Sequence, residues 1–201
     1  MSNELKIKNR APQFSMQEVE SASLDYFNGD HLASTVFASK YALRDNNIAS
    51  LEQGDEPKQF VEDTPDAMHD RLANEFAIKD AKYNNALPYE TFREALNRFK
   101  YIVPQGSPMY GIGNPYVKVS ISNCVVVEYP QDNISGIMET GKDLANLFKR
   151  RCGVGLPLDS LRPLNAIVSN SAGTSTGAWS FANYYSEVCR MIGQNGRRGA
   201  L

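Results

Sequence analysis

KVSISNCVVVEYPQDNISGIMETGKDLANLFKRRCGVG, residues 118–155, holds the pattern that decides the fold. Residues 118–130 are rich in β-branched side chains with partial alternation, which predicts a strand with one well-buried end. Asp132 is placed to cap a helix over residues 134–151, whose three terminal cations suit the negative end of its dipole. Residues 152–163 then indicate a glycine turn that enters a second short strand. Strand, helix and strand in this order predict an α/β fold with parallel pairing.

The chain continues with a loop and a further helix. Residues 169–178, SNSAGTSTGA, combine glycines with five hydroxyl side chains, which is typical of a loop. The helix expected over residues 179–192 carries a continuous apolar stripe, so one of its faces should be buried. The stripe consists of Phe181, Tyr185, Val188, Cys189 and Ile192.

The first hundred residues predict a helical domain. The expected helices span residues 16–27, 31–43, 65–83 and 89–99. Ser15 and Glu18 have capping-box spacing before the first helix, and Pro65 suits the first position of the third. We expect this helical part to be an orienting scaffold without catalytic residues, in which His69 is a solvated or capping-turn group. Polar residues 45–59 predict an exposed loop, and PQGSPMYGIGNP, residues 104–115, a constrained one.

Composition and charge limit the classes of function that this protein can have. The 201 residues are 42% hydrophobic and 22% charged, as in an ordinary soluble globular protein. No apolar run approaches the ~20 residues that span a bilayer, and the start lacks the apolar segment of a signal peptide, so we expect a cytoplasmic protein without a membrane partner. Residues 1–66 contain 6 Lys and Arg against 12 Asp and Glu, whereas residues 141–201 contain 8 against 3. The short basic clusters favour a nucleotide over a nucleic acid; the alternative is a surface that compensates the acidic half.

The sequence contains little evidence for the motifs of hydrolases or metalloenzymes. The three cysteines, Cys124, Cys152 and Cys189, form no CxxC pair, and His31 and His69 complete no metal-ligand spacing, so we expect free thiols and no metal site. The GVG turn lacks the third glycine of a dinucleotide fingerprint and the GK[ST] of a P-loop, so it is weak evidence for a phosphate site.

Four segments in order carry a resemblance to a known family. They are SNCVVVEYPQDNISGI, FKRRCGVGLPLDSLRP, NSAGTSTG and QNGRRGAL, and together they resemble the large catalytic subunit of ribonucleotide reductase. VFASKYAL and TPDAMHDRLANEFA also resemble the N-terminal helical domain of that family. The resemblance implies an α/β fold in which a helical domain, residues 1–100, precedes the first part of a ten-stranded α/β barrel, residues 101–201, with its specificity-effector loops.

The resemblance also implies roles at the substrate. Cys124 occupies the place of one of two cysteines that reduce the 2′ position and become a disulfide, a reaction that needs a dithiol. Ser107, Asn123, Cys152 and Gly153 fall where members of the family contact the substrate. Cys152 stands where glycine or alanine is common, so its side chain is expected to be a tolerated small residue. Cys189 is expected to face the core.

Effector recognition is implied at four further positions. Asp132 matches the acid that holds the ribose of a specificity effector, and Arg162 lies where a cation near the effector phosphates is expected. Gln194 and Arg198 match the second specificity loop, which relays effector identity to the substrate base. The implied effectors are dNTPs or ATP.

The family resemblance sets the expected partners. The radical-forming cysteine and the second reducing cysteine of the family match no position of this sequence, so we expect the N-terminal part of a split or truncated reductase, complemented by the remaining C-terminal part. It would bind no cofactor itself; a metal-containing small subunit or adenosylcobalamin would supply the radical, and an external dithiol the electrons. The assembled oxidoreductase is expected to be a homodimer that reduces ribonucleoside di- or triphosphates. The alternatives are a non-catalytic dNTP-sensing module and a structural helical domain with an incidental α/β tail.

Overall fold

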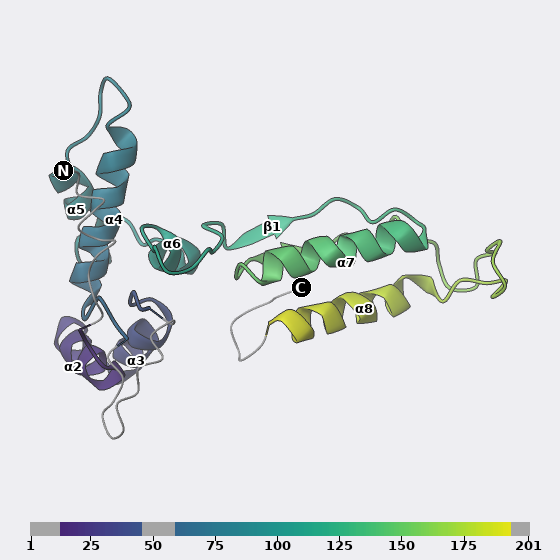
Figure 1. Cartoon of the computed structure of the whole chain (residues 1–201), viewed down its shortest axis with the longest axis horizontal. Helices are drawn as coiled ribbons and strands as arrows, with labels where there is room; N and C mark the ends of the chain where they lie inside the picture. The colour runs from purple at the N-terminus through teal and green to yellow at the C-terminus, as the bar shows by residue number, and fades with distance from the viewer. Residues whose placement is uncertain (1–12, 46–58, 194–201) are drawn as a thin grey trace. The chain divides into compact units, whose positions relative to one another are not determined.

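The chain forms two compact units, one within residues 1–118 and one within residues 119–201 (Figure 1). The computed structural model describes residues 13–45 and 59–193. Most of the predicted exposed loop lies outside the described residues, as does the QNGRRGAL segment with Gln194 and Arg198.

The first unit is helical, as predicted. It contains α2 (Met16–Tyr26), α3 (His31–Lys40), α4 (Pro65–Asp80), α5 (Tyr89–Leu96), the 3₁₀ turn η1 (Asn97–Phe99) and α6 (Gly106–Gly111). The capping box at α2 is confirmed: the Glu18 amide donates to Ser15 Oγ at 3.2 Å, and the Ser15 amide donates to Glu18 Oε2 at 2.7 Å. Pro65 is the first residue of α4, where its missing amide hydrogen leaves no carbonyl unpaired.

The helices of the first unit enclose one apolar core. Phe60 joins two segments to it by isolated antiparallel bridges, one to Phe14 and one to Arg44. Because the core residues come from α2, α3, α4 and α5, burial of apolar area holds these helices together. The buried cluster consists of Val19, Phe37, Ala38, Ala42, Phe60, Met68, Leu72, Ala73 and Leu96.

The prediction of a solvated His69 is wrong. Its side chain is fully buried on α4, and its ring lies edge-on to Phe99 with 4.6 Å between the centroids. Among the described residues neither ring nitrogen has a hydrogen-bond partner. Helical periodicity did not reveal this burial, because the aromatic rings that surround His69 come from other helices.

The segment after residue 100 also differs from expectation. Residues 104–115 contain the short helix α6, where the sequence predicts a loop without helix. Tyr110 of α6 is buried, and Met109 and Ile112 pack against the core of the first unit. The compact unit therefore extends past residue 100 to Lys118.

The second unit combines helices with a small sheet. Its elements are β1 (Cys124–Val126), α7 (Ile134–Phe148), β2 (Gly153–Gly155) and α8 (Gly177–Ile192). β1 and β2 pair in parallel, which confirms the predicted strand, helix and strand order. β1 is shorter than the strand expected within residues 118–130, and the GVG residues predicted as a glycine turn form β2 itself. α7 and α8 lie side by side (Figure 1).

The core of the second unit lies between the sheet and the two helices. The predicted stripe of α8 is confirmed, since Tyr185 and Val188 are buried and the other three members pack against the same cluster. The Tyr185 hydroxyl donates to the carbonyl of Ile137 at 3.2 Å and so ties α8 to α7. The buried cluster consists of Ile137, Leu144, Phe148, Val154, Leu161, Tyr185 and Val188.

The cap of α7 is Asn133, and the prediction that Asp132 caps this helix is wrong. The Gly136 amide donates to Asn133 Oδ1 at 2.8 Å. Both residues are good N-caps, and the sequence alone did not separate them. Asp132 is left with its carboxylate available for another partner.

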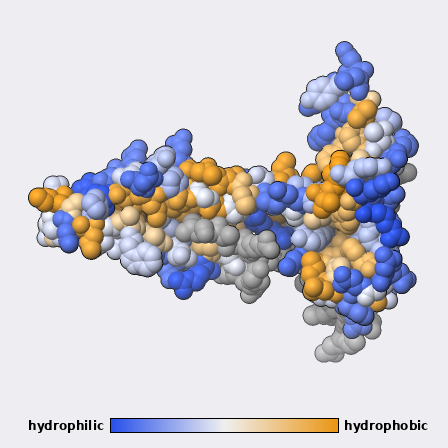
Figure 2. Space-filling view, turned by 180° about the vertical axis from the view of Figure 1, so that it is seen from behind, coloured by the Kyte–Doolittle hydropathy of each residue, from blue (hydrophilic) through white to orange (hydrophobic). Residues whose placement is uncertain are grey.

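Apolar side chains also lie on the surface of the second unit (Figure 2). Val126, Ile167 and Trp179 are 80%, 87% and 77% exposed. Exposed apolar area of this kind often marks a surface that binds another protein segment. In the described part of the chain, no helix is long and apolar enough to cross a membrane.

Acid should destabilise the first unit through His69. Burial, with a smaller contribution from the charge of Arg93, lowers the pKa of His69 from 6.5 to about 4. An unfolded chain takes up this proton near pH 6.5, so the unfolded state binds more protons between the two values. Stability should be complete above about pH 6.5 and fall by about 3 kcal/mol as the pH drops to about 4.

Urea unfolding of the full chain across this pH range measures the effect. His69→Phe should flatten the pH dependence, whereas His31→Gln, a change at an exposed residue of α3, should leave it unchanged. A His69→Phe protein with the wild-type pH dependence would contradict this assignment.

The contact between α7 and α8 should depend on Gly141. A Cβ at this position would lie 2.3 Å from Tyr184 Oη and 2.8 Å from Tyr184 Cζ. Gly141→Ala should therefore destabilise the chain by about 1–2 kcal/mol despite the better helix propensity of alanine. In a Tyr184→Leu background the same change should become neutral or stabilising, and a double-mutant cycle by urea unfolding would show this coupling.

Candidate functional site

The register of the two strands decides which side chains meet. Cys124 pairs with Gly153 and Val125 with Val154, and the Gly153 amide donates to the carbonyl of Asn123 at 2.7 Å. Paired residues of neighbouring strands place their side chains on the same face. Val154 is buried in the core and Cys124 is exposed, so Cys124 lies on the open face of the sheet.

Glycines leave this open face uncovered beside Cys124. Neither Gly153 nor Gly155 carries a side chain, and a Cβ at Gly155 would lie 3.3 Å from Cγ2 of Val126. A small molecule can therefore approach the backbone of β2 next to the thiol. Three of the predicted substrate positions, Asn123, Cys124 and Gly153, are adjacent here.

The other two thiols have different surroundings. Cys152 is fully buried, and its Sγ donates to the carbonyl of Gly153 at 3.4 Å, so its side chain does not lie on the open face. Burial raises the pKa of Cys189, which lowers its thiolate fraction and its reactivity. Both observations fit the expectation that Cys152 and Cys189 are structural.

A second cluster forms where Arg162 meets Asp132. Arg162 Nε donates to Asp132 Oδ2 at 2.7 Å, its backbone amide donates to Oδ1 at 3.3 Å, and Nη2 donates to the Asp132 carbonyl at 3.1 Å. Ser160 Oγ also donates to the carbonyl of Pro130 at 2.7 Å, which fixes the same two segments to each other. The structure thus brings together two of the residues expected at an effector.

This ion pair has consequences for anion binding. The side chains of Arg162 and Asp132 are 37% and 34% exposed, so solvent reaches both. The carboxylate already neutralises the guanidinium, and a phosphate that approaches Arg162 must compete with it. An anionic ligand can therefore bind Arg162 only by displacing the carboxylate of Asp132.

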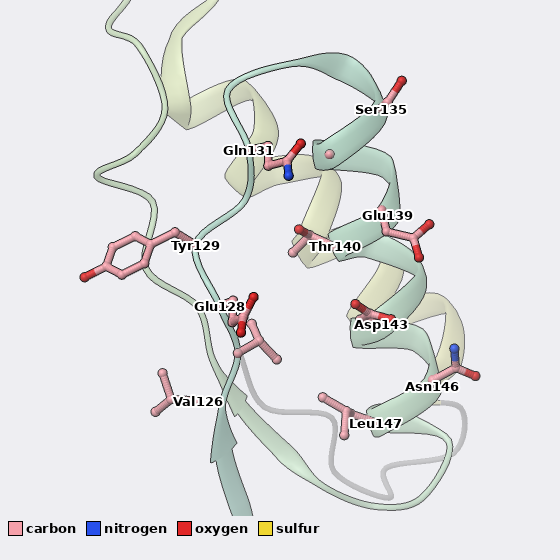
Figure 3. A pocket seen from close by; sticks show the side chains of 12 residues that line it. Val126, Glu128, Tyr129, Gln131, Ser135, Glu139, Thr140, Asp143, Asn146 and Leu147 are labelled. Carbon is pink, nitrogen blue, oxygen red and sulfur yellow. The ribbon is translucent and has the colours of Figure 1, made fainter.

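A groove of about 770 Å³ lies between α7 and the extended chain that follows β1 (Figure 3). Three carboxylates line it, those of Glu128, Glu139 and Asp143, and Lys142 pairs with Glu139 nearby. Such a lining does not suit phosphate. The other lining residues are Val126, Val127, Tyr129, Gln131, Ser135, Gly136, Thr140, Asn146 and Leu147.

This groove was not predicted, although the sequence contains a signal for it. Ser135, Glu139 and Asp143 follow each other at helical spacing on one polar face of α7. Of the predicted substrate and effector residues that the structure describes, none lines the groove. The described residues contain no cluster of three or more His, Cys, Asp or Glu side chains that could hold a metal ion.

Comparison with known proteins confirms the resemblance to ribonucleotide reductase. Residues 122–201 match the family described as "Ribonucleotide reductase, barrel domain". This range includes β1, α7, β2 and α8, and with them Cys124 and the contact between Asp132 and Arg162.

Several relatives carry names from the same family. The chain is 28% identical over 104 residues to the ribonucleoside-diphosphate reductase large chain of Cryptosporidium parvum, an alignment that covers 51% of this chain and 13% of the relative. It is 25% identical over 177 residues to the large subunit from Plasmodium falciparum, covering 87% of this chain and 20% of the relative. The chain therefore spans a fifth or less of the length of these curated relatives.

Removing the acid of the ion pair should release Arg162 for anions. Asp132→Asn should raise the affinity of the full chain for inorganic triphosphate about two- to fivefold, the range expected for loss of a solvent-exposed pair. Arg162→Gln added to this variant should abolish the gain. Calorimetry measures the effect, and Asp159→Asn, at an exposed acid three residues from Arg162, serves as the control. An equal gain in that control would mean that general charge, and not the pair, sets the affinity.

Proposed function

We propose that this chain is the N-terminal part of the catalytic subunit of a ribonucleoside-diphosphate reductase and supplies one thiol of its reducing pair. The observation that carries the proposal is the exposed Cys124 on the open face of the β1–β2 sheet, opposite Gly153. The names of the relatives support a diphosphate substrate. In this proposal the two strands belong to the ten-stranded barrel.

Two thiols are needed for the reduction. Cys124 and a second cysteine lose two electrons and two protons and form a disulfide. The C2′–O bond of the ribose breaks, its oxygen leaves as water, and C2′ gains a hydrogen. The bare backbone of Gly153 lets the ribose approach Cys124 closely, and Ser107, Asn123 and the Cys152 backbone contact the substrate. An external dithiol then restores the thiols.

The remaining machinery is assigned to other parts of the enzyme. We place the radical-forming cysteine and the second reducing cysteine in the C-terminal part of the subunit, which complements this chain. A metal-containing small subunit or adenosylcobalamin supplies the radical that the first of these cysteines carries. The assembled subunit acts as a homodimer in the cytoplasm.

Regulation is assigned to the Asp132–Arg162 pair. In this proposal the ribose of a dNTP or ATP effector contacts Asp132, and its phosphates take Arg162 from the carboxylate. Gln194 and Arg198 then pass the identity of the effector to the substrate base. The direct contact at 2.7 Å supports a shared role for the first two residues.

A non-catalytic dNTP sensor is the second candidate. It is favoured by the same ion pair, which needs no contribution from Cys124 to bind a nucleotide. The two candidates differ in what happens when Cys124 is replaced, because a sensor would keep its full function.

Turnover should depend on Cys124. The purified chain, mixed with the C-terminal part, the radical source and a dithiol, should reduce a ribonucleoside diphosphate. Cys124→Ser should lower this rate by at least about three orders of magnitude, as expected for loss of an essential reacting group, and leave dNTP binding unchanged. The measurement is deoxyribonucleotide formation by chromatography, with dNTP binding followed by calorimetry.

Cys189→Ala provides the matched control, because this half-buried thiol lies on α8 and packs against the core. It should retain turnover. Undiminished turnover in Cys124→Ser would exclude the reducing role, and dNTP binding without any turnover in the wild-type mixture would favour the sensor.

A further inference from the structure

A buried ion pair lies inside the first unit. Arg71 of α4 donates from Nε to Glu62 Oε1 at 2.6 Å and from Nη2 to Glu62 Oε2 at 3.1 Å. Their side chains are 3% and 4% exposed, and the Leu43 amide donates to Glu62 Oε2 at 3.0 Å. Each carboxylate oxygen is therefore satisfied, as a buried charge requires.

The guanidinium has further donors, and they point to α6. Arg71 Nη2 donates to the carbonyl of Met109 at 2.9 Å, and Nη1 donates to the carbonyl of Ile112. Ile112 is the C-cap of α6. The last carbonyls of a helix have no partner within it, and a basic side chain often satisfies them. Arg71 thus connects the end of α6 to Glu62.

The helix α6 needs such support. At six residues it is too short to be stable by its own hydrogen bonds. Gly113, at φ +70°, lets the chain pass close to Arg71, because a Cβ there would lie 2.9 Å from Arg71 Cγ. On the other side, a Cβ at Gly106 would lie 3.2 Å from the Tyr41 ring. The segment is held against α4 at its exit and against Tyr41 at its entry.

We propose that Glu62 and Arg71 are positioning residues for substrate binding, which hold α6 so that Ser107 in its first turn meets the nucleotide. The inference rests on the proposed function, because the contact of Ser107 with the substrate comes from it. Neither Glu62 nor Arg71 contacts the substrate itself. Glu62 fixes the plane of the guanidinium, and the guanidinium fixes the carbonyls of Met109 and Ile112.

The test removes the donors without leaving a buried charge. Arg71→Met alone would leave Glu62 unpaired and could unfold the chain. The double variant Glu62→Gln/Arg71→Met keeps an acceptor for the Leu43 amide and an apolar stem on α4, so the core should fold. Arg93→Met is the matched control, because Arg93 is a second arginine that pairs with acids of α4, namely Asp66 and Asp70.

Two readouts on the full chain separate positioning from stability. Hydrogen exchange should accelerate at least about tenfold at the amides of Met109 and Ile112, which lose the support of the helix end, while the amides of α2 and α4 keep their protection. In the complemented reductase, KM for the ribonucleoside diphosphate should rise about tenfold or more with a smaller change in kcat. Arg93→Met should change neither.

Each result decides one step. Unchanged exchange in α6 would show that Arg71 does not hold this helix, and the proposal would fail. Faster exchange with an unchanged KM would also overturn it, because the position of α6 would then be irrelevant to the substrate. A wild-type mixture without turnover would overturn the proposed function, and with it the substrate role of Ser107, while the exchange data would still report on the anchor.

Discussion

The pairing register between β1 and β2 is the constraint on which the second unit depends. With Cys124 opposite Gly153, Val125 and Val154 both face the core, and the apolar faces of α7 and α8 cover them. A slip by one residue would exchange the two faces of β1. The thiol would then point into the core and a valine into solvent, so the apolar packing that stabilises this unit also keeps Cys124 accessible.

In the first unit, directional hydrogen bonds fix the position of α6, which apolar packing alone does not determine. The core brings α2, α3, α4 and α5 together without directionality, whereas the buried guanidinium of Arg71 bonds to atoms in fixed directions. Glu62 and the carbonyls of Met109 and Ile112 accept these bonds. A six-residue helix thereby acquires a defined place on a larger helical scaffold.

The sequence predicted those features that depend on local patterns. Helix positions, the capping box at Ser15 and the parallel order of β1 and β2 follow from periodicity and short-range hydrogen bonds. It did not predict the burial of His69, because the rings around it come from distant segments. It placed Asp132 at the helix cap, since two adjacent capping residues compete there and the contact with Arg162, thirty residues away, decides between them. Aromatic contacts and ion pairs between residues far apart in the sequence cannot be predicted from short segments of it.

The buried pair in the first unit also limits how this sequence can change over time. Loss of Glu62 or Arg71 alone would strand a charge inside the core, which is far more destabilising than removal of both. Gly113 is constrained by the same pair, because any side chain there would clash with the aliphatic part of the Arg71 side chain. Glu62, Arg71 and Gly113 are thus expected to vary together or not at all. Lineages that replace the ion pair should do so through coupled substitutions that include residue 113.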